Sequence, residues 1–327
     1  MHLRLVLGTI FLAGPLLNAQ VAQVREYNLH TPRDRNSVFA MAITPAQDVL
    51  SFVAKPDGKW LLTRVRNWLD KTPTEQTIDV PGWTRTDLQG AIPPVYADLF
   101  VTSDGHFAIC IASGSWNRNQ KMASDDLISV VNLQQFVVVT TTHAPADPGE
   151  IRSFYLDGAQ HLALIALTSQ NTGGARPMVK PAHAGSIASA PHQAIGNDER
   201  LILLDLPSLA IADQCQLSDS KCDRYLNRLV DSRGFSRIRP SDGSGQVTQD
   251  GRFKLEYAQN FHHNLLDNPV VTDIHVNIQS VKTGSTVGTI NETNHDSLNS
   301  RLASLNARDF LLVMEGGTKL KVYELRE

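Results

Sequence analysis

A short pattern recurs along the chain and limits the folds that are open to it. Each copy has a brief apolar lead, a turn rich in Asp, Gly or Asn, and then a run in which apolar residues alternate. The clearest copy is VTSDGHFAICIAS at residues 101–113. The others are ITPAQDVLSFVAK (43–55), FYLDGAQHLALIAL (154–167), QVTQDGRFKLEYA (246–258) and LASLNARDFLLVME (302–315). Such turn residues mark strand reversals, so each copy predicts two antiparallel strands.

A second unit follows three of these copies. Its members are LISVVNLQQFVVVTTT (127–142), LILLDLPSLAIADQ (201–214) and DIHVNIQSVKTGSTVGTI (273–290), each with two β-rich runs around a tight polar turn. Together the two units predict four antiparallel strands, A to D, that are repeated along the chain. Long-period repetition of this kind is typical of a β-propeller, because blades packed in a ring bury both faces of each sheet.

We therefore expect an all-β chain with a single β-propeller of four-stranded antiparallel blades over residues 20–327. Five blades are expected, with six or seven as alternatives because residues 219–245 fit no unit. The last unit ends without a fourth strand, and QVREYNLH (23–30) alternates ahead of the first copy. We expect that segment to complete the last blade and close the ring; a β-sandwich or two smaller β domains are the alternatives. Residues 170–198, rich in Ala, Gly, Pro and Ser, predict a mobile inserted loop.

These units resemble the degenerate repeats of exported bacterial WD40-like or YVTN-type β-propellers. The resemblance covers nearly all of the mature chain, but it lies in the pattern alone, since the Trp-Asp and Gly-His dipeptides of WD40 repeats and the double glycines of kelch repeats are missing. It implies a fold and a binding scaffold, and it implies no catalytic residue.

The first 19 residues have the features of a secretory signal peptide. Arg4 supplies a positive charge, the apolar run from Leu5 to Leu17 is too short to span a bilayer, and Ala19 or Ala22 offers a small residue for cleavage. A buried N-terminal helix or strand is the alternative. Export predicts a periplasmic or extracellular protein.

Export also permits disulfides. Cys215 and Cys222 flank six polar residues, so we expect them to form a bridge. Cys110 lies inside an alternating apolar run, and we expect it to be buried and free.

The composition excludes several classes of protein. A net charge of −3 argues against a nucleic-acid surface, and no stretch after the leader is long and apolar enough for a membrane helix. The Cys and His residues do not have the spacing of a zinc finger or a haem attachment site, and the sequence contains no nucleophile elbow and no glycine-rich phosphate loop. We expect a monomer with no cofactor, no metal and no nucleic-acid partner.

Propeller topology gathers the B–C and D–A connections on one face, where we expect a protein or small polar ligand to bind. The arginines expected on this face could each donate two hydrogen bonds to a carboxylate or a phosphate of a ligand. The simpler interpretation is that the charged residues of this face pair with one another at a solvated channel mouth. The candidate ligand-binding residues are Arg35, Tyr96, Trp116, Arg118, Arg152, His262, His263 and Arg301.

A secreted carbohydrate-active hydrolase is the alternative function. Asp34, Asp98 and Glu150 begin successive A strands, and glycoside hydrolysis needs two converging carboxyl groups. Aromatic residues, which form sugar-binding platforms, make up only 6% of the chain. Catalysis is therefore the less favoured hypothesis.

Overall fold

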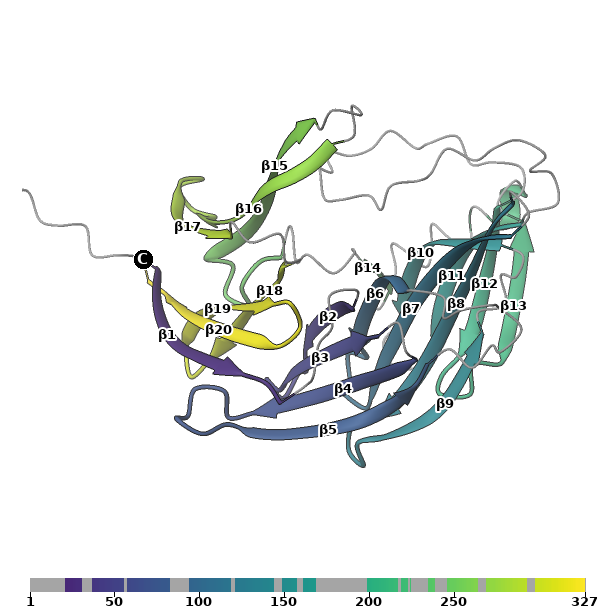
Figure 1. The fold of residues 1–327 in the computed structure, drawn as a ribbon, viewed down its shortest axis with the longest axis horizontal. Coiled ribbons are helices and arrows are strands. Elements are labelled where there is room, and N and C mark those ends of the chain that lie inside the picture. The colour runs from purple at the N-terminus through teal and green to yellow at the C-terminus, as the bar shows by residue number, and fades with distance from the viewer. Residues whose placement is uncertain are drawn as a thin grey trace, which may run out of the picture.

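The computed structural model describes most of the chain after the leader. The described residues are 21–30, 37–55, 58–82, 94–118, 121–143, 149–157, 161–168, 199–216, 219–222, 224, 235–238, 246–263, 269–292 and 298–326. They form strands β1 to β20, arranged in five antiparallel sheets (Figure 1). The leader and the inserted loop at 170–198, both predicted above, lie outside the described residues.

The five sheets are numbered here by their order along the chain. Sheet 1 holds β2 (Val38–Ile43), β3 (Val49–Ala54), β4 (Lys59–Arg66) and β5 (Thr74–Pro81). Sheet 2 holds β6 (Pro94–Val101), β7 (Phe107–Arg118), β8 (Lys121–Asn132) and β9 (Val137–His143). Sheet 3 holds β10 (Gly149–Asp157), β11 (His161–Thr168), β12 (Glu199–Asp205), β13 (Ile211–Gln216) and β14 (Phe235–Ile238). Sheet 4 holds β15 (Phe253–His263), β16 (Pro269–Ser280) and β17 (Thr286–Glu292). Sheet 5 holds β18 (Leu298–Leu305), β19 (Arg308–Glu315), β20 (Lys319–Leu325) and β1 (Val21–Asn28).

The N-terminal strand is the outer strand of sheet 5. β1 pairs antiparallel with β20, from Val21 opposite Leu325 to Asn28 opposite Lys319. The segment that the sequence predicted for this place, 23–30, overlaps β1 over most of its length. The first and the last described strands therefore lie in one sheet.

Sheets 3 and 4 depart from the four-stranded unit. β14 pairs with β10 at the edge of sheet 3, and in sheet 4 the expected A strand is reduced to one isolated bridge between Val247 and Lys254. Sheet 3 therefore has five strands and sheet 4 has three.

The repeated turn has one hydrogen-bonding arrangement in sheets 2 and 4. The Thr102 hydroxyl donates to Asp104 Oδ1 at 2.6 Å, and it accepts the N–H of Phe107 at 3.0 Å. Thr248 makes the same two bonds, to Asp250 Oδ1 at 2.8 Å and from the N–H of Phe253 at 3.0 Å. The glycine after each Asp has a positive φ, which favours glycine there. The sequence repeat thus reflects a repeated turn that satisfies its own backbone.

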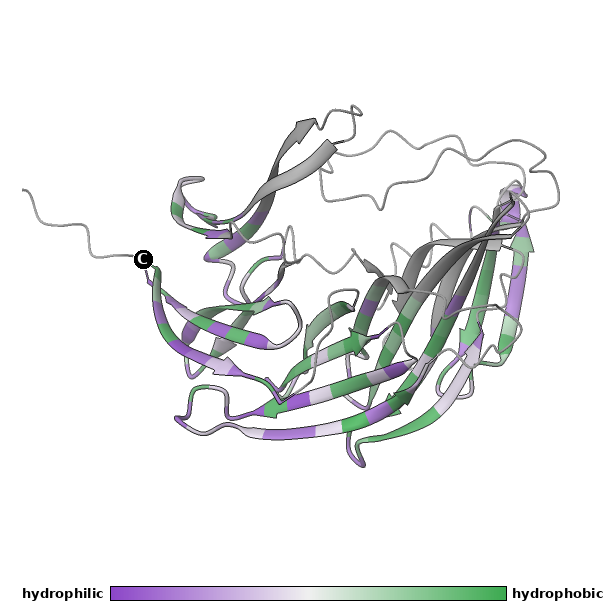
Figure 2. Ribbon diagram, in the orientation of Figure 1, coloured by the Kyte–Doolittle hydropathy of each residue, from purple (hydrophilic) through white to green (hydrophobic). Residues whose placement is uncertain are grey.

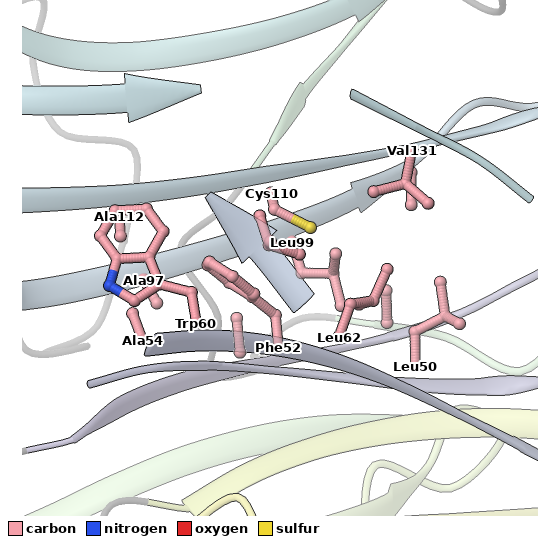
Figure 3. Packing of buried hydrophobic residues seen from close by; sticks show 14 of the residues in the cluster. Leu50, Phe52, Ala54, Trp60, Leu62, Ala97, Leu99, Cys110, Ala112 and Val131 are labelled. Carbon is pink, nitrogen blue, oxygen red and sulfur yellow. The ribbon is translucent and has the colours of Figure 1, made fainter. Parts of the chain in front are cut away.

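Apolar clusters join the sheets face to face in the order 4, 5, 1, 2, 3. The cluster between sheets 1 and 2 includes Phe52 and Trp60, whose rings meet edge to face with centroids 5.9 Å apart, and Cys110 from the facing sheet (Figure 3). Three further clusters join sheets 2 and 3, sheets 5 and 1, and sheets 4 and 5. Consecutive antiparallel sheets packed face to face support a β-propeller fold.

Burial falls from the inner strands to the outer strand of sheet 1. Every residue of β3 is buried, whereas β5 is mostly exposed and hydrophilic (Figure 2). This gradient follows from the position of β5 at a sheet edge, where charged and polar side chains discourage further strand pairing. Among the described residues, no helix has the length and hydrophobicity that a membrane span requires.

Candidate functional site

Two segments that the sequence predicted as B–C loops are extended hairpins. β7 and β8 pair as far as Arg118 opposite Lys121, although the pairing of β6 with β7 ends at Pro94 opposite Gly114. The pairing of β9 with β8 begins only at Leu127 opposite His143. The end of the β7–β8 hairpin therefore projects beyond both neighbouring strands. Trp116 and Arg118 lie on it, and only their backbone is described.

The second hairpin belongs to sheet 4. β15 and β16 pair through to His263 opposite Pro269, whereas β17 pairs with β16 only as far as Ile274 opposite Glu292. The backbone of His262 and His263 lies on the projecting part, opposite Val270 and Pro269. Sequence reasoning found these residues but assigned them to loops, because strand pairing beyond the edge of a sheet leaves no distinct sequence signal.

Sheet 4 also has one strongly polar face, which the sequence analysis missed. Successive residues of a strand point to opposite faces, and the cross-strand register aligns the polar positions of the three strands. We call this surface the polar face of sheet 4; each of its side chains is half-buried or exposed. Its residues are Lys254, Glu256, His275, Asn277, Gln279, Thr286, Thr289 and Asn291.

The side chains of the polar face bond to one another across the strands. Gln279 Nε2 donates to Glu256 Oε2 at 2.6 Å, and Lys254 Nζ lies 3.3 Å from Glu256 Oε1. A second row pairs His275 Nδ1 with Asn291 Oδ1 at 2.6 Å. The face is thus a hydrated surface in which amide, imidazole and carboxylate groups are held in register.

No other described sheet face has this character. Sheets 1, 2 and 5 contribute to apolar clusters on both faces, and the buried Leu201 and Leu203 lie on the face of sheet 3 away from sheet 2. Polar groups buried in a dry contact cost free energy unless each is paired. The polar face of sheet 4 therefore suits water or a polar partner. The alternation in LEY and IHVNIQ was the available sequence signal for it.

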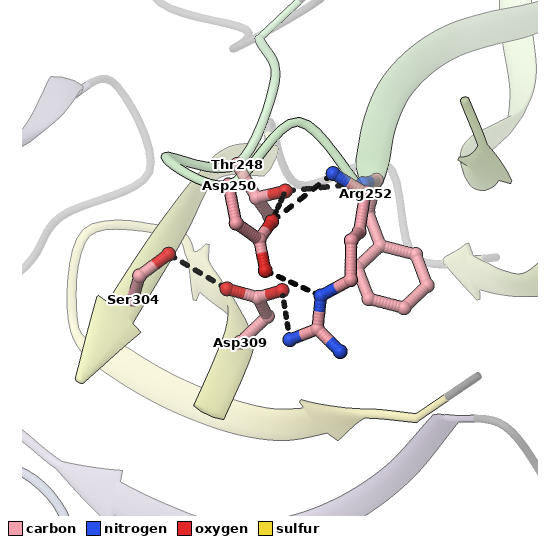
Figure 4. Close-up of polar contacts among 6 residues, drawn as sticks. Thr248, Asp250, Arg252, Ser304 and Asp309 are labelled. Atoms are coloured by element: carbon pink, nitrogen blue, oxygen red, sulfur yellow. Dashed lines mark hydrogen bonds and ion pairs between the residues drawn. The ribbon is translucent and has the colours of Figure 1, made fainter. Parts of the chain in front are cut away.

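An ionic network fixes sheet 4 against sheet 5 (Figure 4). Arg252 Nε pairs with Asp250 Oδ2 in the same turn, and Arg252 Nη2 lies 2.8 Å from Asp309 Oδ2 in β19. Ser304 donates to Asp309 Oδ1 at 2.7 Å, and Asp309 is only 1% exposed. This network orients the apolar face of sheet 4 toward sheet 5, which leaves the polar face turned away from it.

The network also shifts the pKa values of Asp250 and Arg252. Burial favours a higher pKa for the Asp250 carboxyl, but hydrogen bonds from the Arg252 backbone, the Thr248 hydroxyl and the Arg252 guanidinium lower that pKa to about 2. The bond with Asp250 raises the pKa of Arg252. Both groups stay charged at neutral pH, so the network is a permanent structural contact.

Of the three candidate catalytic carboxylates, only Asp98 has a described side chain. Asp98 is 6% exposed and, by alternation with Phe100, lies on the face of β6 that packs toward sheet 3. Only the backbone of Glu150 is described, and Asp34 lies outside the described residues. The buried Asp98 therefore lies on the face of sheet 2 that packs toward sheet 3.

The other candidate residues are only partly described. Arg301 is half-buried on β18, where its guanidinium donates to the carbonyl of Ser300 at 2.8 Å. Tyr96 and Arg152 are described by backbone alone, and Arg35 lies outside the described residues. Arg301 is thus the one candidate ligand-binding residue whose side chain is described, and the set remains a prediction.

Two of the cysteines are bridged and the third is buried. Cys215 and Cys222 form a disulfide at the end of β13, with their Cα atoms 5.8 Å apart. Cys110 is buried, and burial raises the pKa of its thiol, so it is held as an unreactive thiol. Within the described part of the chain, no group of three His, Cys, Asp or Glu residues is placed to hold a metal ion.

Comparison with known proteins gives distant matches among solved structures only. No family profile matches the chain, and no curated protein matches it. TolB from Acinetobacter baumannii is similar at 12% identity and a TM-score of 0.20, over 89% of this chain and 64% of that chain. The Dos1 propeller is similar at 8% identity and a TM-score of 0.30, over 88% of this chain and 68% of that one. The chain thus spans less than two thirds of the TolB chain, and the case for the fold rests on its own sheets and clusters.

Proposed function

We propose that this chain is an exported β-propeller that serves as a binding scaffold. Its five sheets are the blades, stacked face to face in the order 4, 5, 1, 2, 3, and β1 completes sheet 5 beside β20. The binding surface is the polar face of sheet 4 together with the projecting β7–β8 and β15–β16 hairpins. The single observation that carries the proposal is the polar face, because its side chains are half-buried or exposed polar groups and none of them belongs to an apolar cluster.

The architecture supports a division between rigid support and variable surface. Sheets 1, 2 and 5 pack apolar side chains on both faces, which holds the blades in place. The backbone of the two hairpins extends beyond the strands that flank them. Binding residues are commonly carried on such segments over a rigid scaffold.

The chemistry of the surface indicates the kind of partner. The charge of Lys254 is balanced by Glu256, and the remaining groups are amides, hydroxyls and an imidazole. These groups favour hydrogen bonding over charge attraction. The partner is therefore a hydrophilic protein surface or a small polar ligand.

Export is part of the proposal. The N-terminal leader and the Cys215–Cys222 disulfide both support it, because structural disulfides persist in oxidising compartments. A periplasmic or extracellular location follows.

The test compares charge placed on the polar face with the same charge placed elsewhere. The bait proteins are the wild type, Asn291→Lys, Gln279→Lys and the control Thr74→Lys at an exposed position of β5, each used to capture partners from the exported fraction and to screen glycan and peptide arrays. We expect the wild type and the control to bind one partner alike. The two polar-face variants should lose at least about tenfold in affinity, or ~1.4 kcal/mol, with thermal midpoints near that of the wild type. Equal binding by all four proteins would refute the assigned surface.

A further inference from the structure

The outer strand of sheet 3, β13, is held in place by very little side-chain packing. The outer strands of sheets 1 and 2 are better anchored, since β5 buries Val80 and β9 has four half-buried residues. In β13, five of the six residues are exposed, and the one half-buried residue is Cys215. Even Ile211, the largest apolar side chain of the strand, is 52% exposed. Apart from Cys215, β13 is therefore attached to the sheet mainly by its backbone pairing.

The neighbouring strand, β12, has the opposite character. Its residues 201–204 are all buried and apolar, and β13 pairs with them, with Leu201 opposite Cys215. If β13 moved away, β12 would become the outer strand of sheet 3. Its backbone N–H and C=O groups would then lack partners beside buried apolar side chains, and an edge of this kind pairs readily with other chains.

The Cys215–Cys222 bridge links β13 to a well-packed point. Cys222 is 2% exposed and lies in a helical turn at residues 220–222. Asp219 precedes this turn, and its Oδ1 accepts the backbone N–H of Lys221 at 2.9 Å, as a capping residue does. The bridge thus joins the weakly packed β13 to a capped turn whose cysteine is buried.

We propose that the Cys215–Cys222 bridge is a redox-sensitive restraint that keeps β13 on β12, so that its reduction opens the outer edge of sheet 3 while the other sheets stay folded. The inference does not depend on the proposed binding surface. Its consequence for the cell rests on the proposed export, because the restraint forms only where thiols are oxidised.

The chemistry of the restraint is thiol–disulfide exchange. When the bridge forms, the two cysteine thiols lose two protons and two electrons, and the disulfide of a partner oxidant becomes a dithiol. Dithiothreitol reverses this step: its two thiols become a cyclic disulfide, and both cysteines regain their protons. An external thiolate reaches the bridge from the side of the half-buried Cys215, because Cys222 is buried.

Hydrogen exchange with mass spectrometry tests the restraint on the exported full chain, oxidised and after treatment with dithiothreitol. We expect peptides from β12 and β13 to exchange at least about tenfold faster in the reduced protein, and peptides from β3 and β8 to exchange at unchanged rates. Unchanged protection of β12 would overturn the proposal. Loss of protection in every sheet would also overturn it, because the restraint would then not be local.

The matched control is the double variant Cys215→Ser, Cys222→Ser. We expect it to exchange like the reduced wild type, with or without dithiothreitol. Cys110 is kept in both proteins, since it is buried and burial raises the pKa of its thiol. A double variant that exchanged like the oxidised wild type, or that still responded to dithiothreitol, would overturn the role of the bridge. A wild type that bound no partner would refute the proposed function and leave these results unaffected.

Discussion

Single residues connect the blades through a few charged contacts. Arg252 and Asp309 belong to different sheets and meet at 2.8 Å, where Asp309 is almost fully buried. Arg64 has a similar position between sheets 1 and 2: it donates to the carbonyl of Leu133 at 2.6 Å and stacks over Phe136. Such contacts add orientation to apolar packing, since hydrogen bonds with charged groups require a defined geometry.

Asp250 gives a prediction about pH. Its pKa of about 2 in the folded chain lies below the ordinary value of 3.8, so its stabilising effect is present above about pH 3.8 and is lost as the pH falls toward 2. We expect Asp250→Asn to reduce the loss of stability across this window, as measured by urea unfolding at each pH. The control Asp79→Asn changes an exposed carboxylate on β5. If Asp250→Asn lost as much stability as the wild type over this pH range, protonation of Asp250 would not be the cause of the loss.

At the scale of elements, the repeated turn determines where the strands reverse. Thr102 is fully buried, and its hydroxyl both donates to Asp104 and accepts the N–H of Phe107. Thr248 repeats the arrangement in sheet 4. The same residue types therefore recur because they satisfy the same backbone groups.

The turn gives a second prediction. Thr102→Val keeps the shape of the side chain but leaves the Phe107 N–H without its hydroxyl acceptor, so we expect a loss of about 1–3 kcal/mol in the free energy of unfolding. Thr102→Ser keeps the hydroxyl and should recover most of that loss. The control Thr74→Val, on an exposed position of β5, should change little. Chemical denaturation of the four proteins measures these values, and an equal effect of Val and Ser at position 102 would contradict the role of the hydroxyl.

At the scale of the whole molecule, the sheets differ in how they are buried. Sheets 1, 2 and 5 have apolar contacts on both faces, whereas sheet 4 has one apolar face and one polar face. Regions with fewer buried apolar contacts open at lower free energy than regions packed on both sides. The molecule should therefore have a stable centre and a more easily opened sheet 4.

Hydrogen exchange tests this difference. We expect the slowest amide exchange in β3, β7 and β19, and faster exchange in β16, although β16 is also a central strand with a neighbour on each side. Mass spectrometry of peptides from these strands provides the comparison. Protection of β16 equal to that of β3 would contradict the distinction between the sheets.

Local sequence patterns were sufficient for the all-β class, for the strand reversals and for the place of the N-terminal strand beside β20. Those features depend on turn chemistry and alternation, which short segments carry in full. The Cys215–Cys222 bridge was likewise predicted from a short spacing and is present.

Only the tertiary structure decided the rest. The pairing of β14 with β10, the hairpins that extend past their neighbours, and the burial of Asp98 between sheets depend on contacts between segments far apart in the chain. The alternation around Lys254 and His275 indicated a polar face, but which neighbour it meets is set by the packing of whole sheets. The sequence by itself thus determined where strands form and turn, because those choices are local. The tertiary structure decided which faces become buried, because burial depends on what each sheet packs against.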